Sequence, residues 1–192
     1  MSTAPQPIPA TSVQEAARRD LEMPEWRRAA SRAVHPSAQT VERASLAAIA
    51  EGLAHVTLPW ELSTGEAPAE RRYEQVLATA AYDAWVIYWP AGFELPLHDH
   101  GGSWGAFSVV GGELTEVTPV DGALTATPMG VGATVQFGPE HVHAVANRTR
   151  RPATSVHVYS PPLASMAFFE EQHDGTLDAV REEDQSEWET GR

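Results

Sequence analysis

The sequence predicts an all-β jelly-roll barrel with N-terminal helices, and three observations point to this fold class. From Tyr82 onward, short segments rich in valine, threonine and aromatic residues follow one another at intervals of roughly ten residues. Turn-forming pairs separate several of these segments, among them Gly111-Gly112 and Asp121-Gly122. Before Tyr82 the chain has helical periodicity instead. Short strands at regular spacing are typical of a β-sandwich or barrel.

The helices are expected in the N-terminal part of the chain. Within residues 37–55, apolar residues recur every three to five positions, which indicates an amphipathic helix. These residues are Val41, Leu46, Ile49 and Leu53. One or two short helices are also expected within 12–34. Residues 58–70 are predicted to form a loop, and 71–81 are compatible with either a short helix or a strand.

The expected strands fall within a single domain. They lie in the stretches 82–89, 105–117, 123–130, 133–138, 141–147 and 153–162. A chain of 192 residues corresponds to about one domain. We therefore expect a barrel domain over 37–170, a disordered or helical extension over 1–36 and an acidic tail over 171–192.

Charge and composition narrow the classes of partner. The chain has 13 Lys and Arg residues and 26 Asp and Glu residues, so its formal net charge is −13. Such a surface repels nucleic acid and anionic lipid, so neither is an expected partner. No apolar run approaches the ~18 residues of a membrane helix, and no secretory signal is recognisable. A cytoplasmic location is therefore expected.

Because the chain has no cysteine, any metal ion must be held by His, Asp or Glu.

Two pairs of histidines provide the strongest indication of function. His98 and His100 flank Asp99, and His141 and His143 have the same spacing. On a strand, residues two apart point to the same face, so both imidazoles of a pair can reach one ion. Imidazole is the commonest transition-metal ligand. Two such pairs in a β-rich chain without cysteine favour a metal site.

A third group of polar residues follows in the last predicted strand. Ser155, His157 and Tyr159 alternate with apolar residues, so their side chains are expected to share one face. A strand with one polar face would explain the pattern without any function. The position of the group beside a predicted metal site favours a functional role.

The histidine segments resemble the two motifs of the cupin superfamily. The first motif has the form G-x5-H-x-H-x4-E-x6-G and matches Gly92, His98, His100 and Gly112, with Gly105 at the glutamate position. The second motif matches Gly132, His143 and Asn147. The resemblance therefore implies a cupin jelly-roll barrel and selects His98, His100 and His143 as metal ligands. His141 remains the alternative third ligand.

The absent glutamate makes the sequence similar to the cysteine dioxygenase family, whose Fe(II) is held by three histidines. The resemblance includes Ser155, His157 and Tyr159, which match the Ser-His-Tyr relay of that family, and the following Ser160-Pro161-Pro162 turn. Animal members carry a cysteine at the position of Gly105 that crosslinks to the relay tyrosine. That crosslink cannot form here, as in bacterial relatives, because the chain has no cysteine.

The resemblance implies an Fe(II)-dependent small-thiol dioxygenase. Such an enzyme adds both atoms of O2 to the sulfur of cysteine or 3-mercaptopropionate and yields a sulfinate. Tyr159 would then donate a hydrogen bond toward the bound substrate or oxygen, His157 would hold Tyr159, and Ser155 would orient His157. The expected partners are the thiol and O2. The oligomeric state is left open, with a monomer among the outcomes.

Two residues are candidates for binding the substrate carboxylate. Tyr73-Glu74-Gln75 resembles the Y-x-Q form found in family members that prefer 3-mercaptopropionate, and this favours Gln75. An ungapped count back from Trp89 favours Arg72 instead. Arginine would give a charged bidentate contact, whereas glutamine would give a single neutral hydrogen bond.

Two other function classes remain as alternatives. A different cupin metalloenzyme would keep the histidines and lack the relay. A non-enzymatic cupin that binds a metal or small molecule would be expected to carry a partner-binding segment. The relay residues favour the dioxygenase over the first class, and the strongly acidic chain, without a recognisable DNA-reading helix, disfavours a DNA-binding regulator.

Overall fold

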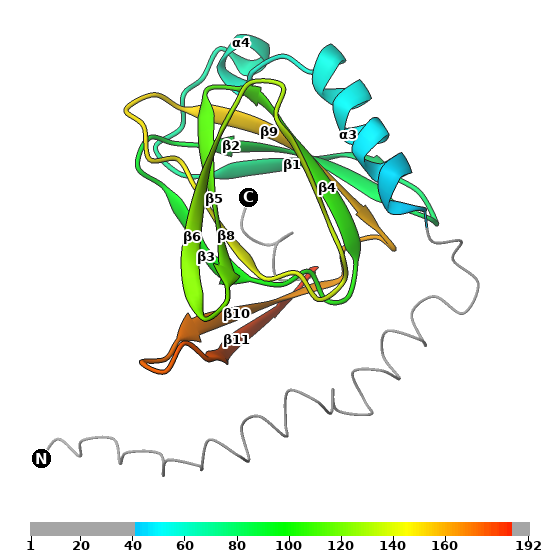
Figure 1. Cartoon of the computed structure of the whole chain (residues 1–192). Helices are drawn as coiled ribbons and strands as arrows, with labels where there is room; N and C mark the ends of the chain where they lie inside the picture. The colour runs from blue at the N-terminus through cyan, green and yellow to red at the C-terminus, as the bar shows by residue number, and fades with distance from the viewer. Residues whose placement is uncertain (1–40, 186–192) are drawn as a thin grey trace, which may run out of the picture. The chain divides into compact units, whose positions relative to one another are not determined.

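Two antiparallel sheets face each other in the structure, which is a computed structural model that describes residues 41–185. The helices predicted within 12–34 lie outside the described residues. One sheet has the order β1-β2-β9-β4-β7 and the other the order β11-β10-β3-β8-β5-β6. Figure 1 shows the two sheets enclosing the centre of the barrel. The predicted all-β jelly-roll class is confirmed.

The strands are short, and β2, β4, β5, β6, β7, β8 and β9 lie at the predicted stretches, whereas β3, β10 and β11 were not among them. The first sheet contains β1 (Arg72–Ala78), β2 (Asp83–Trp89), β9 (Ala153–Ser160), β4 (Trp104–Gly111) and β7 (Thr134–Phe137). The second contains β11 (Leu177–Asp184), β10 (Ser165–Glu171), β3 (Glu94–His98), β8 (His143–Ala146), β5 (Glu113–Val120) and β6 (Ala123–Gly130). The ambiguous segment 71–81 thus contains a strand rather than a helix.

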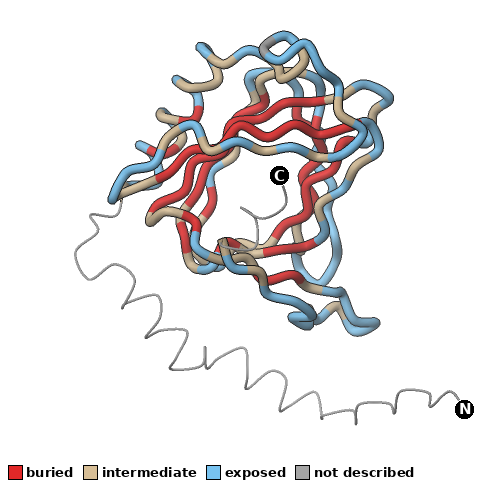
Figure 2. The backbone as a smooth tube through the Cα atoms, turned by 180° about the vertical axis from the view of Figure 1, so that it is seen from behind, coloured by how far each residue is buried: buried red, intermediate tan, exposed pale blue. Residues whose placement is uncertain are grey.

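The main core fills the space between the sheets. Its largest buried side chains include Trp89 and Phe107 from the first sheet and Leu114 from the second. In Figure 2 the buried residues concentrate in the central strands of the barrel, while the connecting turns are exposed. Because apolar side chains from both sheets interdigitate there, burial holds the strand ends that carry the candidate site in fixed positions.

The predicted N-terminal helix is present as α3 (Arg43–Val56) and covers the outer face of the first sheet. Leu46 and Ala50 are fully buried against Val156 and Val158 of β9, which explains the apolar periodicity. The short helix α4 (Trp60–Thr64) lies within 58–70, so the prediction of a loop is wrong there. Pro59 precedes this helix and Gly65 ends it in a left-handed conformation, which limits it to five residues.

The C-terminal segment also differs from its prediction. The acidic tail expected from residue 171 is wrong for Leu177–Asp184, which form β11 paired with β10. Most residues of β11 are exposed on both faces, since it lies at the edge of the sheet. An edge strand gains its stability from ladder hydrogen bonds and does not need an apolar alternation, so the sequence lacks that signal. We accordingly expect the domain to extend at least to Asp184.

No helix within 41–185 is long and apolar enough to cross a membrane.

Candidate metal centre and its pocket

Three of the predicted histidines converge at one end of the barrel. The ligand nitrogens of His98, His100 and His143 lie within 4.8 Å of one another, a spacing that could hold one metal ion. His98 ends β3 and His143 begins β8, and the two are directly opposed in the antiparallel ladder. His100 follows β3, so the prediction that both members of this pair lie on a strand is wrong for His100. The turn after β3, rather than strand alternation, brings it to the group.

The hydrogen bonds of these histidines define their tautomers. His98 Nδ1 lies 2.7 Å from the Pro96 carbonyl, and His143 Nδ1 lies 2.7 Å from Glu116 Oε1. In each case Nδ1 is the donor, which leaves the lone pair on Nε2. Among the described residues, His143 Nε2 and both nitrogens of His100 are buried without a hydrogen-bond partner. Buried polar atoms of this kind are rare unless they serve a ligand, so the group fits a metal ion.

Burial keeps these imidazoles neutral at physiological pH. The pKa values of His98 and His100 fall well below the ordinary value, because burial disfavours the charged form and His143 adds repulsion. Burial also lowers the pKa of His143, against the raising effect of its hydrogen bond to Glu116. Only the neutral imidazole carries the lone pair that a metal ion needs. The group is therefore ready to bind a cation without first losing protons.

The structure also explains why no acidic ligand joins the histidines. A Cβ atom at Gly105 would lie 2.3 Å from the ring of Phe137, so a larger residue there would require the ring to move. The Phe137 ring stacks on His100 with 4.5 Å between ring centroids and 24° between planes. An aromatic ring thus fills the space where a glutamate at position 105 would extend.

The three relay residues form a continuous hydrogen-bonded row on β9. Ser155 Oγ lies 2.8 Å from His157 Nε2, and His157 Nδ1 lies 3.1 Å from the Tyr159 hydroxyl. The row begins one step earlier, at Trp89, whose indole Nε1 donates to Ser155 Oγ at 2.8 Å. Phe107 stacks flat on the His157 ring, with 4.9 Å between centroids and 8° between planes. The predicted shared face of this strand is observed.

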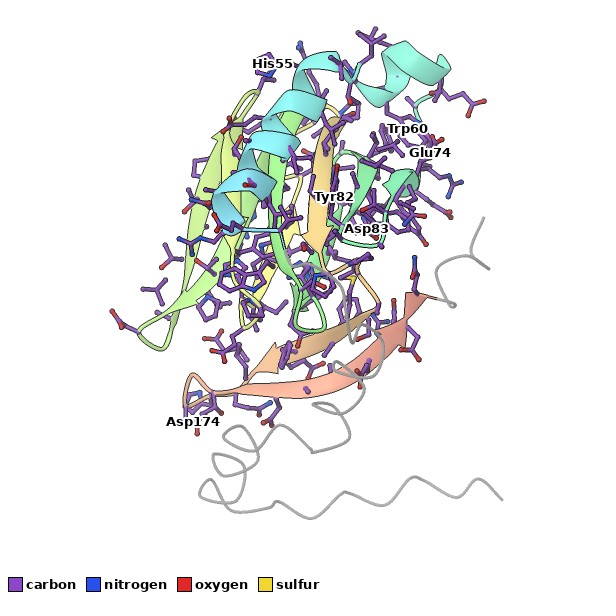
Figure 3. All side chains as sticks on the ribbon, turned by 90° about the vertical axis from the view of Figure 1, so that its right-hand side faces the viewer. His55, Trp60, Glu74, Tyr82, Asp83 and Asp174 are labelled. Carbon is purple, nitrogen blue, oxygen red and sulfur yellow. The ribbon has the colours of Figure 1, made fainter. Side chains whose placement is uncertain are left out.

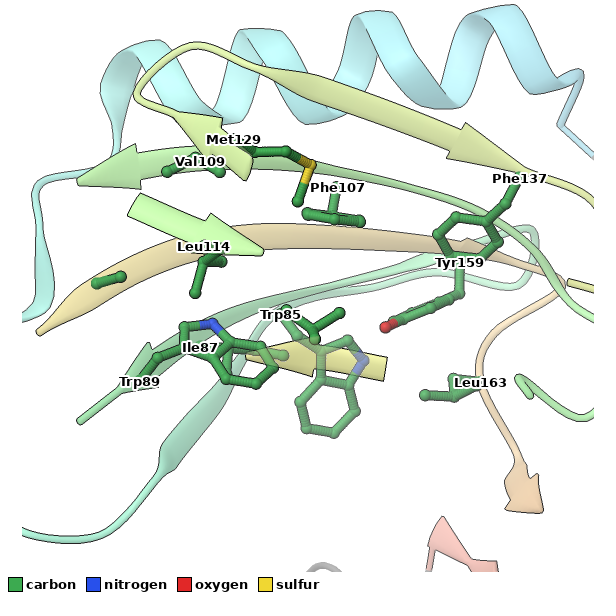
Figure 4. Packing of buried hydrophobic residues seen from close by; sticks show 12 residues of the cluster. Trp85, Ile87, Trp89, Phe107, Val109, Leu114, Met129, Phe137, Tyr159 and Leu163 are labelled. Carbon is green, nitrogen blue, oxygen red and sulfur yellow. The ribbon is translucent and has the colours of Figure 1, made fainter. Parts of the chain in front are cut away.

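The donor at Trp89 is compatible with one direction of donation along the whole row. Indole nitrogen can only donate, so the Ser155 hydroxyl is free to donate to His157 Nε2. In that direction neutral His157 carries its proton on Nδ1 and donates it to Tyr159, whose own O–H then points elsewhere. Burial raises the pKa of Tyr159 and lowers that of His157, so both stay in these forms at neutral pH. Figure 4 shows the Tyr159 hydroxyl directed into the interior beside Trp85.

A pocket connects His98 with the last two relay residues. Its cavity volume is about 110 Å³, which is below the roughly 300–1,000 Å³ usual for drug-sized ligands. His98, His157 and Tyr159 line it together with residues that are mostly apolar or aromatic. These other residues are Arg71, Tyr73, Trp85, Ile87, Trp89, Leu95, Val145, Leu163, Met166, Phe168 and Glu183. Trp85 and Trp89 are buried core residues that also form part of the pocket wall.

A family model described as cysteine dioxygenase type I matches residues 68–172, which is more than half of the 192-residue chain. The chain belongs to the cysteine dioxygenase type I family. The matched residues include the three histidines, the relay and Arg71. No curated protein matches the sequence.

Several solved structures also resemble the chain. An RmlC-like cupin protein from Desulfovibrio desulfuricans is 21% identical, with a TM-score of 0.44 over 52% of this chain and 92% of that one. A double-stranded β-helix protein from Klebsiella pneumoniae is 20% identical, with a TM-score of 0.43 over 60% and 89% of the two chains. An oxalate oxidase structure is 16% identical, with a TM-score of 0.46 over 54% and 57%.

In this cysteine dioxygenase family member, the pocket arginine is Arg71 rather than Arg72. The Arg71 guanidinium lies 5.0 Å from the Trp89 ring centroid and 5.2 Å from that of Tyr73. Arg71 Nε is buried and finds no hydrogen-bond partner within 41–185. Arg72 points the opposite way, is exposed and pairs with Glu70 at 3.3 Å. Arg72 does not line this pocket, since neighbours on a strand face opposite sides, and its role toward the substrate carboxylate stays a prediction.

Gln75 shares the inward face of β1 with Tyr73 but lies outside the pocket lining. Its amide Nε2 donates to Asp83 Oδ2 at 3.3 Å. Asp83, which Figure 3 locates at the start of β2, also accepts a hydrogen bond from Trp85 Nε1 at 2.9 Å. Burial raises the pKa of Asp83 to about 6, despite these donors. Gln75 thus supports the pocket wall through Asp83, and a direct role toward substrate stays a prediction.

Sequence reasoning missed three residues beside the site: Arg71, Trp89 as a relay donor, and Glu116. The alternation of odd-numbered residues on β1 could have pointed to Arg71, because it shares a face with Tyr73. Glu116 is one of two glutamates of β5, and the sequence does not distinguish it from Glu113. Nothing in the sequence connects Trp89 to Ser155, which is 66 residues away.

Proposed function

We propose that this cysteine dioxygenase family member is an Fe(II)-dependent dioxygenase of small thiol carboxylates, cysteine or 3-mercaptopropionate. The reaction is R–SH + O2 → R–SO2⁻ + H⁺, so both oxygen atoms end on sulfur and no further reductant is needed. The observation that carries the proposal is one pocket in which a guanidinium and a tyrosine hydroxyl lie with His98, a member of the neutral histidine triad.

His98, His100 and His143 would hold the iron. When bound, Fe(II) supplies a site at which the sulfur and O2 can react side by side. Three neutral ligands leave the charge of the ion uncompensated and several coordination positions open, which suits an anionic sulfur ligand. Zinc, nickel, cobalt and copper also bind imidazole, so the three histidines alone do not select iron. We propose iron because of the resemblance to the dioxygenase family.

Arg71 would bind the substrate carboxylate. It is the cation of the pocket lining, and its buried Nε is available to a ligand. A guanidinium in apolar surroundings binds a carboxylate through two short hydrogen bonds. With the carboxylate at Arg71 and the sulfur near His98, the pocket selects substrates whose two groups are a few atoms apart.

Tyr159 would donate its hydroxyl proton in a hydrogen bond toward the reacting end of the substrate. With donation running from Trp89 through Ser155 and His157, the tyrosine oxygen would serve as an acceptor and its O–H would be free for the pocket. The aromatic and aliphatic lining excludes water and strengthens this polar contact.

The test is oxygen uptake by protein loaded with iron under anaerobic conditions. Cysteine, 3-mercaptopropionate, cysteamine and mercaptosuccinate are supplied separately, and sulfinate is quantified. We expect one sulfinate for each O2 consumed with at least one thiol carboxylate, and no uptake by His98→Ala. Stoichiometric iron binding without uptake for any of the four thiols would overturn the proposal and favour another cupin chemistry or a binding role.

We also propose that the enzyme acts in the cytoplasm, where small thiols are kept reduced. Fractionation of the source cells tests this location.

A further inference from the structure

A buried carboxylate contacts the candidate metal centre and lies outside the lining of the pocket. Glu116 is in the middle of β5 and only 8% exposed. It is directly opposed to Val145 in the ladder between β5 and β8. His143 is two residues before Val145, so its side chain lies on the same face of the sheet as Glu116. The register thus places one carboxylate against one candidate metal ligand.

The contacts of Glu116 are short and directed. Its Oε1 accepts from His143 Nδ1 at 2.7 Å and contacts His141 Nε2 at 3.2 Å. His141 stacks on Phe137, with 5.1 Å between centroids and 16° between planes. Glu116 is therefore a buried carboxylate held between two histidines.

These three residues do not fit a metal site of their own, although their ligand atoms also lie within 4.8 Å of one another. Two atoms bound ~2.1 Å from one ion lie about 3 Å or more apart. The separation of 2.7 Å between Glu116 and His143 is that of a charge-assisted hydrogen bond instead.

We propose that Glu116 is the positioning residue of the metal centre: it aims His143 Nε2 at the ion and supplies negative charge through the imidazole. The histidine triad itself contains no anionic ligand. A carboxylate that accepts the outer N–H of a bound imidazole makes that imidazole a stronger electron donor. His141 in turn holds Glu116 from the solvent side. This inference rests on the metal centre of the proposed function, but not on its thiol chemistry.

Two measurable properties should follow from this arrangement. The first is affinity, because a fixed and more basic ligand binds a divalent ion more tightly. The second is the reduction potential, because nearby negative charge favours Fe(III) over Fe(II). If the hydrogen bond between Glu116 and His143 were purely structural, its loss would change the metal affinity weakly and the reduction potential hardly at all.

The decisive variant is Glu116→Gln, which keeps an oxygen acceptor for His143 and removes the charge. We expect Fe(II) affinity, measured by competition with a chelator, to fall roughly 10–100-fold. We also expect the Fe(III)/Fe(II) midpoint potential to become more positive. Glu113→Gln is the matched control, since Glu113 lies on the same strand, carries the same charge and is exposed. It should leave both values at those of the unchanged protein.

Two further measurements keep the test decisive if Glu116→Gln folds poorly. Thermal unfolding of the metal-free variants reports folding separately. His141→Gln leaves the bond between Glu116 and His143 in place and should weaken Fe(II) binding less than Glu116→Gln does. Unchanged affinity and potential in folded Glu116→Gln would overturn the inference, as would two ions bound per chain.

The result is independent of thiol turnover. If the unchanged protein binds iron but oxidises no thiol, the proposed function fails while the role of Glu116 can still be decided. If the unchanged protein binds no metal ion at all, the inference fails with it.

Discussion

The two sheets of the barrel contribute different parts of the site. The six-stranded sheet and the turn after β3 carry the three candidate metal ligands and Glu116. The five-stranded sheet carries the relay in the middle of β9, and Arg71 immediately precedes its edge strand β1. In the proposed function, one sheet would therefore hold the ion, whereas the other would act on what binds beside it. This division implies that metal binding and turnover can be separated by mutation.

The geometry of each sheet suits its task. At the end of the β3–β8 ladder, directly opposed residues bring two ring centroids to 4.8 Å, as in His98 and His143. Along β9, residues two apart lie roughly 7 Å from each other between Cα atoms, which side chains span only as a row of hydrogen bonds. Side chains that converge, as on β3 and β8, can bind one metal ion. Side chains in a row, as on β9, can orient the hydroxyl at the end of the row.

The largest expected effect comes from removing a ligand on the six-stranded sheet. His143→Ala should lose stoichiometric iron binding and all oxygen uptake, because two imidazoles hold an ion poorly. Metal analysis after iron loading checks this prediction. His141→Ala, which removes the other member of the same pair, should retain about one ion per chain. The reverse result would make His141 the third ligand.

A change on the five-stranded sheet should preserve the ion and slow the reaction. Tyr159→Phe keeps the ring and removes the hydroxyl, so we expect kcat to fall about 100-fold, the scale of a lost proton-donor contact. Iron content should stay at the level of the unchanged protein. A variant that loses its iron as well would contradict the separation of the two sheets.

The two neighbouring arginines test the faces of β1. Arg71→Gln should lower kcat/KM for cysteine or 3-mercaptopropionate ~10–100-fold, since hydrogen bonds to a charged group contribute about 1.5–3 kcal/mol. Turnover of cysteamine, which has no carboxylate, should be affected much less. Arg72→Gln is the matched control and should leave steady-state kinetics unchanged. Equal losses in both variants would show that position on the strand face is irrelevant.

Acid should destabilise the metal-free protein through histidines of both sheets. His98, His100, His143 and His157 all have folded-state pKa values below the ordinary value near 6.5. Below pH 6.5 the unfolded chain binds more protons than the folded one, so stability falls as pH falls. Each histidine contributes up to about 1.4 kcal/mol per pH unit.

Asp83 has the opposite effect on the pH dependence of stability. Its pKa is raised to about 6 in the folded state, so its protonated form stabilises the fold as the pH falls. One carboxylate does not outweigh four histidines, so the net slope remains positive. Urea unfolding of metal-free protein between pH 5 and pH 7 checks the sign. Stability that rises toward pH 5 would show that these histidines are protonated in the folded protein.

Much of the fold and most of the candidate site could be predicted from the sequence, because those features depend on local spacing. Alternation alone predicts that Ser155, His157 and Tyr159 share one face, and β9 has that face. The motif spacing selects His98, His100 and His143, and these three come together. The helix 43–56 is visible in its apolar periodicity. Strand and helix periods are properties of the backbone, so they can be recognised without knowledge of any neighbour.

Only the tertiary structure shows which residues far apart in the chain contact each other. Arg71 rather than Arg72 faces the pocket because a shift of one residue reverses every side chain of a strand. Glu116 meets His143 across 27 residues, and Trp89 meets Ser155 across 66, through the register of strands that the sequence does not encode locally. The strand β11 forms because β10 offers it a partner edge, not because its own residues demand burial. Periodicity determines which way a side chain points, but only the packed sheets determine what it meets.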